Sequence, residues 1–222
     1  MGGANYQLII GDKNYSSWSL RPWLLMRVMG IPFSETKVLL KVPERHANIL
    51  KHSPSGKVPA LKVDGQTIWD TLAIIEFMAE RHPDKPVWPR DAMVRALARS
   101  ASAEMHSGFA DLRNEMPMDI LRHLPKPPSE AVQKDVRRIV EIWRLCRRAN
   151  GKGGPFLFGA FSAADAMYAP VATRFRTYGV DLAALGDDGT AAAYGEAILA
   201  MPEMAEWSKD ARAELKERGE TL

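Results

Sequence analysis

Three prolines lie within eight residues at positions 82–89, and the hydrophobic pattern differs on the two sides of them. Before this segment, short apolar runs alternate with helical patterns, whereas after it the apolar residues recur only at helical spacing. A chain of 222 residues is long enough to form two domains. We therefore predict a mixed α/β domain at residues 1–82, a linker at residues 83–89 and an all-helical domain at residues 90–222.

The first domain is predicted to hold a sheet with helices on its faces. Strand patterns cover residues 6–10, 33–40, 58–63 and 66–69, and helical patterns cover residues 18–29, 43–50 and 71–81. The dipeptide Asp64-Gly65 is typical of a hairpin turn and joins the last two strands. The resulting order, β-α-β-α-β-β-α, favours a mixed sheet.

The second domain is predicted to be entirely helical. Its helical patterns cover residues 90–123, 130–150, 162–178 and 191–215, the last with a break at Pro202. Cys146, the only cysteine, lies within one of these patterns, so we interpret it as a core thiol with no role in chemistry. A single cysteine also excludes an intrachain disulfide, which fits a reducing compartment.

The composition limits the classes of function. The chain carries 30 basic and 27 acidic residues, and this small, dispersed excess does not indicate nucleic-acid binding. The five histidines lack the spacing of metal ligands. The first residues lack the pattern of a signal peptide, and no stretch approaches the roughly 20 apolar residues that span a bilayer. We therefore expect a cytoplasmic protein that binds no metal, no nucleic acid and no membrane.

Two dipeptides in the first domain are candidates for binding. Pro59 opens a strand, and a cis bond to it would turn the backbone N–H and C=O of Val58 outward, where they could pair with a bound peptide. A trans bond would make Pro59 an ordinary strand start. Asp70-Thr71 begins a helix, where the pair either serves only as a cap or holds a carboxylate at the free N–H groups.

A third candidate is the segment Tyr15-Ser16-Ser17-Trp18, which places hydroxyl groups at the start of a helix. Serine commonly caps helices, and capping alone accounts for these residues structurally. A hydroxyl at the positive end of a helix can also donate a hydrogen bond to an anionic atom. The sequence alone leaves both interpretations open.

These segments occur in an order that resembles the glutathione transferase superfamily. The resemblance rests on residues 16–21 after the first strand, residues 53–61, residues 70–74 and the run Ser162-Ala163-Ala164-Asp165. It covers nearly the whole chain and implies a thioredoxin-like first domain, an all-helical second domain, glutathione as co-substrate and a homodimer. It also implies a cis bond before Pro59.

Within the superfamily, the segment is most similar to the zeta class, whose signature is Ser-Ser-Cys-Ser-Trp-Arg. Trp18 stands where that signature has cysteine, so the chain resembles a bacterial, serine-type enzyme that lacks the active-site cysteine. The resemblance implies that a serine O–H donates to the glutathione thiolate. Ser16 is favoured over Ser17 because it lies five residues before Arg21, and Tyr15 is a third candidate.

The resemblance also implies where the rest of glutathione binds. The backbone of Val58, beside Pro59, would pair with the cysteinyl residue, and Asp70 and Thr71 would hold the γ-glutamyl end. The glycyl carboxylate needs a cation, and the candidates are Lys57 and then Lys41. A second substrate would lie between the domains, near residues that include Trp18, His106, Arg113, Arg174 and Arg176. The two arginines near position 175 could bind a dicarboxylate or could instead form interdomain ion pairs.

Three functions follow from the resemblance. The first is conjugation of glutathione to a small electrophile. The second is glutathione-dependent cis–trans isomerisation of a dicarboxylate, the activity of maleylacetoacetate isomerases of the zeta class. The third is a binding or regulatory protein that kept the fold and lost turnover.

Overall fold

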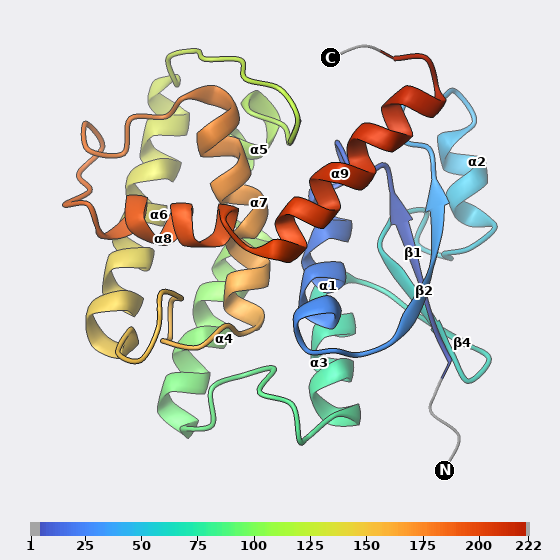
Figure 1. Ribbon diagram of the computed structural model, residues 1–222, viewed down its shortest axis with the longest axis horizontal. Helices are drawn as coiled ribbons and strands as arrows, with labels where there is room; N and C mark the ends of the chain where they lie inside the picture. The colour runs from blue at the N-terminus through green and yellow to red at the C-terminus, as the bar shows by residue number, and fades with distance from the viewer. Residues whose placement is uncertain (1–4, 221–222) are drawn as a thin grey trace.

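The computed structural model describes residues 5–220, which form two domains side by side (Figure 1). The first domain has the predicted order β-α-β-α-β-β-α, and its elements are β1 (Tyr6–Gly11), α1 (Ser17–Val28), β2 (Phe33–Val38), α2 (Arg45–Leu50), β3 (Ala60–Val63), β4 (Gln66–Ile68) and α3 (Thr71–Arg81). The sheet order is β2-β1-β3-β4, with β1 parallel to β2 and the other two pairs antiparallel. This is the mixed sheet that the sequence patterns predict, in the thioredoxin-like form that the resemblance implies.

Side-chain alternation along β1 builds a core on each face of the sheet. Leu8 and Ile10 belong to the large cluster that also contains Leu24 of α1. Ile9 points the other way and packs with Ile49 of α2 in a small separate cluster. β1 is therefore covered on both faces of the sheet.

The second domain is helical, and its elements are α4 (Ala92–Ser107), α5 (Ala110–Glu115), α6 (Glu130–Asn150), α7 (Ala163–Tyr178), α8 (Thr190–Leu199) and α9 (Pro202–Glu217). Pro202 is the first residue of α9, so the predicted break is confirmed. Among residues 5–220, no helix combines the length and apolar character that crossing a bilayer requires.

The prediction of one helix over residues 90–123 is wrong. α4 ends at Gly108, whose backbone is extended, and Phe109 takes a left-handed conformation with φ of 57° while its side chain is buried. α5 then ends before Pro117, which cannot continue a helix. An irregular segment follows as far as α6, and it contributes part of the site described below.

α7 is the centre of the molecule and is buried along nearly its whole length, in contact with α1, α4 and α8. Its start is fixed by a capping box in which Asp165 accepts from the N–H of Ser162 at 2.8 Å. Burial raises the pKa of Asp165 to about 6. Cys146 of α6 is buried as predicted, and burial raises its pKa to about 12, so the thiolate is disfavoured.

α9 leaves the helical domain and crosses back over α1 toward the sheet, as Figure 1 shows. The ring of Trp207 in α9 packs edge-on against Trp23 of α1, with 4.9 Å between the ring centroids. Both indoles are fully buried. The last helix of the second domain therefore packs against the first domain.

Candidate functional site

A cavity of about 760 Å³ opens between the two domains. One wall comes from the start of α1, the turn before β3 and the start of α3, and the other comes from α4, α5, α7 and the segment after α5. The predicted site residues in its lining are Ser17, Trp18, Lys57, Val58, Pro59, Asp70, Thr71, His106, Arg113 and Arg174. Segments that are far apart in the sequence thus meet around one space.

The turn before β3 presents backbone to this cavity. The Val58-Pro59 bond is cis, as the resemblance implies, and Pro59 is buried. β3 begins at Ala60, so Val58 lies outside the ladder that joins β3 to β1. The tight turn is possible because Gly56 adopts a φ of 64°.

The start of α3 joins the first domain to the cavity and to the helical domain. The carboxylate of Asp70 caps α3 by accepting from the N–H of Leu72 at 3.0 Å, and its other oxygen contacts Nε2 of His106 in α4. The buried hydroxyl of Thr71 donates to the carbonyl of Trp18 at 3.2 Å, which ties α3 to α1. The start of α3 therefore lines the cavity with Asp70 and Thr71.

The two serines at the start of α1 have different surroundings. The Ser16 hydroxyl donates to Oγ of Ser19 at 2.7 Å, and Ser16 does not line the cavity. The Ser17 hydroxyl lines the cavity and accepts a hydrogen bond from Nη2 of Arg174 at 3.1 Å. The geometry therefore favours Ser17, whereas the sequence reasoning favours Ser16.

Two buried arginines lie behind Ser17. Arg174 also donates from Nε to the carbonyl of Met116 at 3.0 Å, and Arg21 donates from Nη1 to the carbonyl of Ser17 at 2.9 Å. Burial, followed by the charge of Arg113, lowers the pKa of Arg174 to about 10. Burial, followed by the charge of Arg174, lowers the pKa of Arg21 well below its ordinary value. Two cations are thus held close together out of water, a costly arrangement that an anion would relieve.

Two guanidinium groups lie over the ring of Trp18. The guanidinium of Arg21 lies 4.1 Å from the ring centroid, and that of Arg113 lies 5.4 Å from it. The His106 ring packs edge-on at 5.3 Å between centroids. Within the part of the chain that the structure describes, no carboxylate forms an ion pair with Arg21, Arg113 or Arg174. The cavity therefore has a cationic side.

Sequence profiles of two domains match this chain. The profile described as glutathione S-transferase, N-terminal domain, matches residues 15–81, and the profile described as glutathione S-transferase, C-terminal domain, matches residues 129–210. The chain belongs to the glutathione S-transferase family.

Relatives of this glutathione S-transferase include zeta-class proteins. A probable maleylacetoacetate isomerase 1 from Drosophila melanogaster is 30% identical over 171 residues, which cover 75% of this chain and 67% of the relative. A probable maleylacetoacetate isomerase from Caenorhabditis elegans is 36% identical, but the match covers only 49% of this chain and 50% of that protein. A zeta-class glutathione S-transferase from Euphorbia esula is 34% identical, with coverage of 45% and 44%.

Solved structures share the fold across almost the whole length. A glutathione transferase homologue from Burkholderia gl BGR1 with bound glutathione has a TM-score of 0.70 and 24% identity, and the match covers 94% of this chain and 99% of that one. A homologue from Drosophila mojavensis with bound glutathione has a TM-score of 0.72 and 19% identity, with coverage of 95% and 94%. These likenesses support the two-domain fold of a glutathione S-transferase.

Three residues that the sequence marks for this transferase site lie outside the cavity, namely Ser16, described above, Lys41 and Arg176. Arg176 is two residues from Arg174 on α7, a rotation of about 200° on a helix, and it donates to the carbonyl of Ile120 at 2.8 Å. The ammonium group of Lys41 lies over the ring of Tyr15, 3.4 Å from its centroid. Lys57 lines the cavity and is exposed.

The cavity of this transferase also has lining residues that the sequence reasoning missed. They are Ser55, Trp69, Asn114, Pro117 and Met118, with Tyr15 named only as a third choice of thiol donor. Ser55 and Trp69 flank predicted residues, and Pro117 carries the signal that ends α5. Within residues 5–220, no three His, Cys, Asp or Glu side chains gather in a group that could hold a metal ion.

Proposed function

We propose that this glutathione S-transferase binds glutathione in the interdomain cavity and that the Ser17 hydroxyl donates a hydrogen bond to the thiolate. The thiolate then attacks a small electrophile to give a glutathione conjugate. One observation carries this assignment, which is the hydrogen bond from buried Arg174 to Oγ of Ser17 at 3.1 Å.

That hydrogen bond leaves the proton of the Ser17 hydroxyl available for another acceptor. A hydroxyl has one proton to donate and two lone pairs that accept. Because Arg174 occupies a lone pair of Ser17, the proton is free to point into the cavity toward an anion. The Ser16 proton is instead used in the bond to Ser19. Ser17 is therefore the better donor to a sulfur anion.

The energies match the change in thiol acidity that catalysis needs. A free thiol has a pKa near 8.5, and each unit of lowering requires about 1.4 kcal/mol of preferential stabilisation of the thiolate. A hydrogen bond to a charged acceptor contributes about 1.5–3 kcal/mol. The two buried arginines behind Ser17 add to this in the same direction. A shift of one or two units is therefore expected.

The rest of glutathione fits the remaining wall of the cavity. The backbone of Val58 would pair with the cysteinyl residue in the manner of strand addition, since Val58 precedes the sheet and lines the cavity. The γ-glutamyl end would bind at the start of α3, where Asp70 meets its ammonium and the N–H of Thr71 meets its carboxylate. Lys57 is the lining cation available to the glycyl carboxylate.

A second candidate function is glutathione-dependent cis–trans isomerisation of a dicarboxylate. The observation that favours it is the group Arg21, Arg113 and Arg174, which has no carboxylate partner among the described residues. In this reaction the thiolate adds to a carbon–carbon double bond, the resulting single bond rotates, and elimination returns the thiolate. The relatives described as maleylacetoacetate isomerases are consistent with this chemistry.

The first test measures thiolate formation. Glutathione is titrated into wild type, Ser17→Ala and Ser16→Ala, and the ultraviolet absorbance of the thiolate is followed against pH together with conjugation of a chromogenic aryl halide. Wild type and Ser16→Ala are expected to form thiolate near neutral pH, and Ser17→Ala is expected to lose most of it. The reverse order of the two variants would contradict the assignment of Ser17.

Product analysis then separates the candidate functions. Conjugation consumes glutathione, whereas isomerisation of a maleyl dicarboxylate leaves its concentration unchanged. A wild-type protein that binds glutathione but forms neither thiolate nor product would instead be a binding or regulatory protein.

We also propose that the protein is a cytoplasmic homodimer. The single, buried Cys146 supports a reducing compartment. The family resemblance supports a dimer, and so does Met93 at the start of α4, whose apolar side chain is 78% exposed. Light scattering of the purified protein tests the assembly, and a monomer at micromolar concentration would contradict it.

A further inference from the structure

The loop between β1 and α1, residues 12–15, is held at successive positions by the second domain. The carboxylate of buried Asp12 pairs with Arg218, which follows α9. The side chain of buried Asn14 donates to Asp119 at 2.8 Å and accepts from the N–H of Leu121 at 3.1 Å. Between them, Lys13 is held by α9 itself. The loop that leads to Ser17 is therefore held in part by contacts about 100 and 200 residues away in the sequence.

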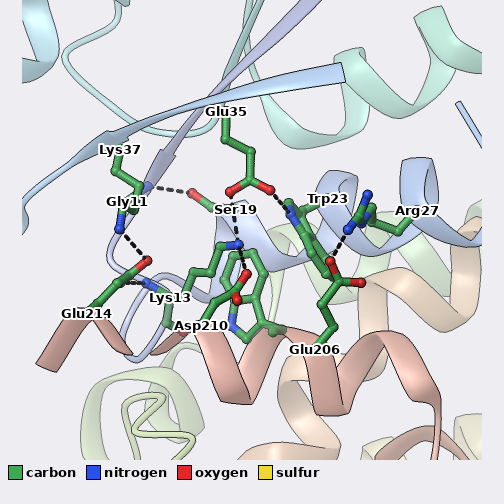
Figure 2. Close-up of polar contacts among 11 residues, drawn as sticks. Gly11, Lys13, Ser19, Trp23, Arg27, Glu35, Lys37, Glu206, Asp210 and Glu214 are labelled. Atoms are coloured by element: carbon green, nitrogen blue, oxygen red, sulfur yellow. Dashed lines mark hydrogen bonds and ion pairs between the residues drawn. The ribbon is translucent and has the colours of Figure 1, made fainter. Parts of the chain in front are cut away.

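Lys13 is bound through its side chain, as Figure 2 shows. Its ammonium group lies 2.9 Å from a carboxylate oxygen of Glu35 in β2 and 2.7 Å from one of Asp210 in α9, while only 3% of the side chain is exposed. The same group lies 4.9 Å from the centroid of the Trp23 ring and 5.1 Å from that of Trp207. A buried charge with this many partners has one defined position.

The backbone of Lys13 is bound by α9 as well. Its N–H donates to a carboxylate oxygen of Glu214 at 2.9 Å, and its carbonyl accepts from the indole N–H of Trp207 at 2.6 Å. Glu214 is itself held by Lys37 of β2 at 3.2 Å. Both backbone hydrogen-bonding groups of Lys13 thus bind side chains of the last helix.

Hydrogen bonds between residues close in the sequence connect the loop to the serines at the start of α1. The carbonyl of Asp12 accepts from the N–H of Tyr15 at 3.1 Å and from that of Ser16 at 2.8 Å. The N–H of Gly11 donates to the Ser19 hydroxyl at 3.1 Å. A displacement of Lys13 therefore moves the first turn of α1, where Ser17 lies.

From this arrangement we infer that Trp207 and Glu214 are positioning residues for the thiol-activating Ser17. The inference rests on the proposed function and goes beyond it, because no residue of α9 lines the cavity. The side chains of Trp207 and Glu214 bind the backbone of Lys13 and so fix the loop. The loop fixes the start of α1, and this places the Ser17 hydroxyl 3.1 Å from Nη2 of Arg174. α9 thereby belongs to the thiol-activating machinery without touching glutathione.

The test compares three variants of the full-length chain. Trp207→Phe keeps an aromatic ring but removes the indole N–H. Glu214→Met removes the acceptor for the Lys13 N–H, whereas Glu214→Gln retains one. The matched control is Glu206→Gln, which breaks an exposed ion pair between α9 and Arg27 of α1 but does not touch the loop. For each variant, glutathione affinity is measured by calorimetry, and thiolate formation and turnover are measured against pH.

Trp207→Phe and Glu214→Met are expected to lower turnover about tenfold to a hundredfold, the scale of a small misplacement in a catalytic site. The pH at which bound glutathione forms thiolate should rise, and glutathione affinity should change less than threefold. Glu214→Gln and Glu206→Gln should follow the wild-type pH profile.

A purely structural role would lower the unfolding midpoint of Trp207→Phe and Glu214→Met while both kept the wild-type pH profile, and this result overturns the inference. If Trp207→Phe does not fold, the Glu214 pair decides alone, and equal profiles for Gln and Met also overturn it. Wild-type protein that forms no thiolate removes the proposed function and the inference together.

Discussion

Arg174 of α7 donates to Oγ of Ser17 at 3.1 Å, and this hydrogen bond joins the centre of the helical domain to the start of α1. Both residues are buried, and the guanidinium is held in place by the carbonyls of Met116 and Pro170. The contact sets the orientation of the serine hydroxyl and places a positive charge beside the atom that it serves.

Arg174→Met should therefore weaken thiol activation more than glutathione binding. The hydroxyl of Ser17 loses the donor that orients it, and the site loses a buried charge, so turnover should fall about tenfold to a hundredfold. The pH dependence of turnover at saturating glutathione should shift to higher pH. The control is Arg174→Lys, which keeps the positive charge but lacks the planar guanidinium group. It is expected to retain only part of the activity. An unchanged pH profile in Arg174→Met would contradict the role given to this residue.

Arg113 and Arg176 should differ in an assay with a dicarboxylate, because of these two only Arg113 lines the cavity. Arg113→Ala removes a lining cation and should raise KM for the dicarboxylate about tenfold. Arg176→Ala, on the opposite side of α7, should change KM less than twofold. KM for the dicarboxylate is determined for both variants from initial rates at saturating glutathione. Equal effects of the two substitutions would place the dicarboxylate elsewhere.

Asp165 predicts a pH dependence of stability. Burial raises its pKa from 3.8 to about 6 in the folded protein, so the folded state binds the proton more strongly than the unfolded state does. Its contribution to the free energy of unfolding is therefore fully present below about pH 4 and is lost as the pH rises to about 6, a change on the order of 3 kcal/mol.

Asp165→Asn remains neutral at every pH and tests this contribution. Urea unfolding at several pH values between 4 and 7 should give a difference between wild type and variant that shifts in favour of the variant as the pH rises. Asparagine also loses one acceptor of the capping box, which costs about 1–3 kcal/mol independently of pH. A difference that stays constant across this range would exclude Asp165 as the titrating group.

Cys146 should be dispensable for activity. Its side chain is fully buried in α6, and its raised pKa keeps it as a neutral thiol. Cys146→Ala should retain wild-type turnover and lose about 1 kcal/mol of stability. Cys146→Ser buries a hydroxyl in its place and should be less stable than Cys146→Ala. Turnover and chemical unfolding of both variants are the measurements, and loss of turnover in folded Cys146→Ala would contradict a purely structural thiol.

Local patterns predicted the elements of the fold because helix and strand periodicities are written in neighbouring residues. The order of the elements in the first domain and the start of α9 at Pro202 are examples, whereas the cis bond before Pro59 was implied by the family resemblance. The long helix over residues 90–123 failed because its break depends on Phe109, which turns left-handed while its side chain is buried. That burial is decided by neighbours distant in the sequence.

The same limit applies within the site. The sequence placed hydroxyls at the start of α1, but which of Ser16 and Ser17 faces the cavity depends on Ser19 and Arg174. Nothing in the sequence distinguishes Arg174 from Arg176, but α7 is packed on nearly all sides, and the two side chains lie on different faces of it. Arg174 lines the interdomain cavity, whereas Arg176 lies at a separate pocket beside α9. Periodicity gives the angle between two side chains on a helix but not the direction in which the helix faces.

The path of α9 has a consequence during synthesis. The ribosome delivers the β1–α1 loop first, but the indole and carboxylate that hold Lys13 emerge almost 200 residues later. Until then the first domain can fold its sheet while the backbone of Lys13 lacks its partners in α9 and its ammonium group has only the carboxylate of Glu35. Under the proposed function, the start of α1 is thus completed only after α9 has emerged, so a partly synthesised chain holds the backbone proposed to bind glutathione before it holds the proposed reactive centre.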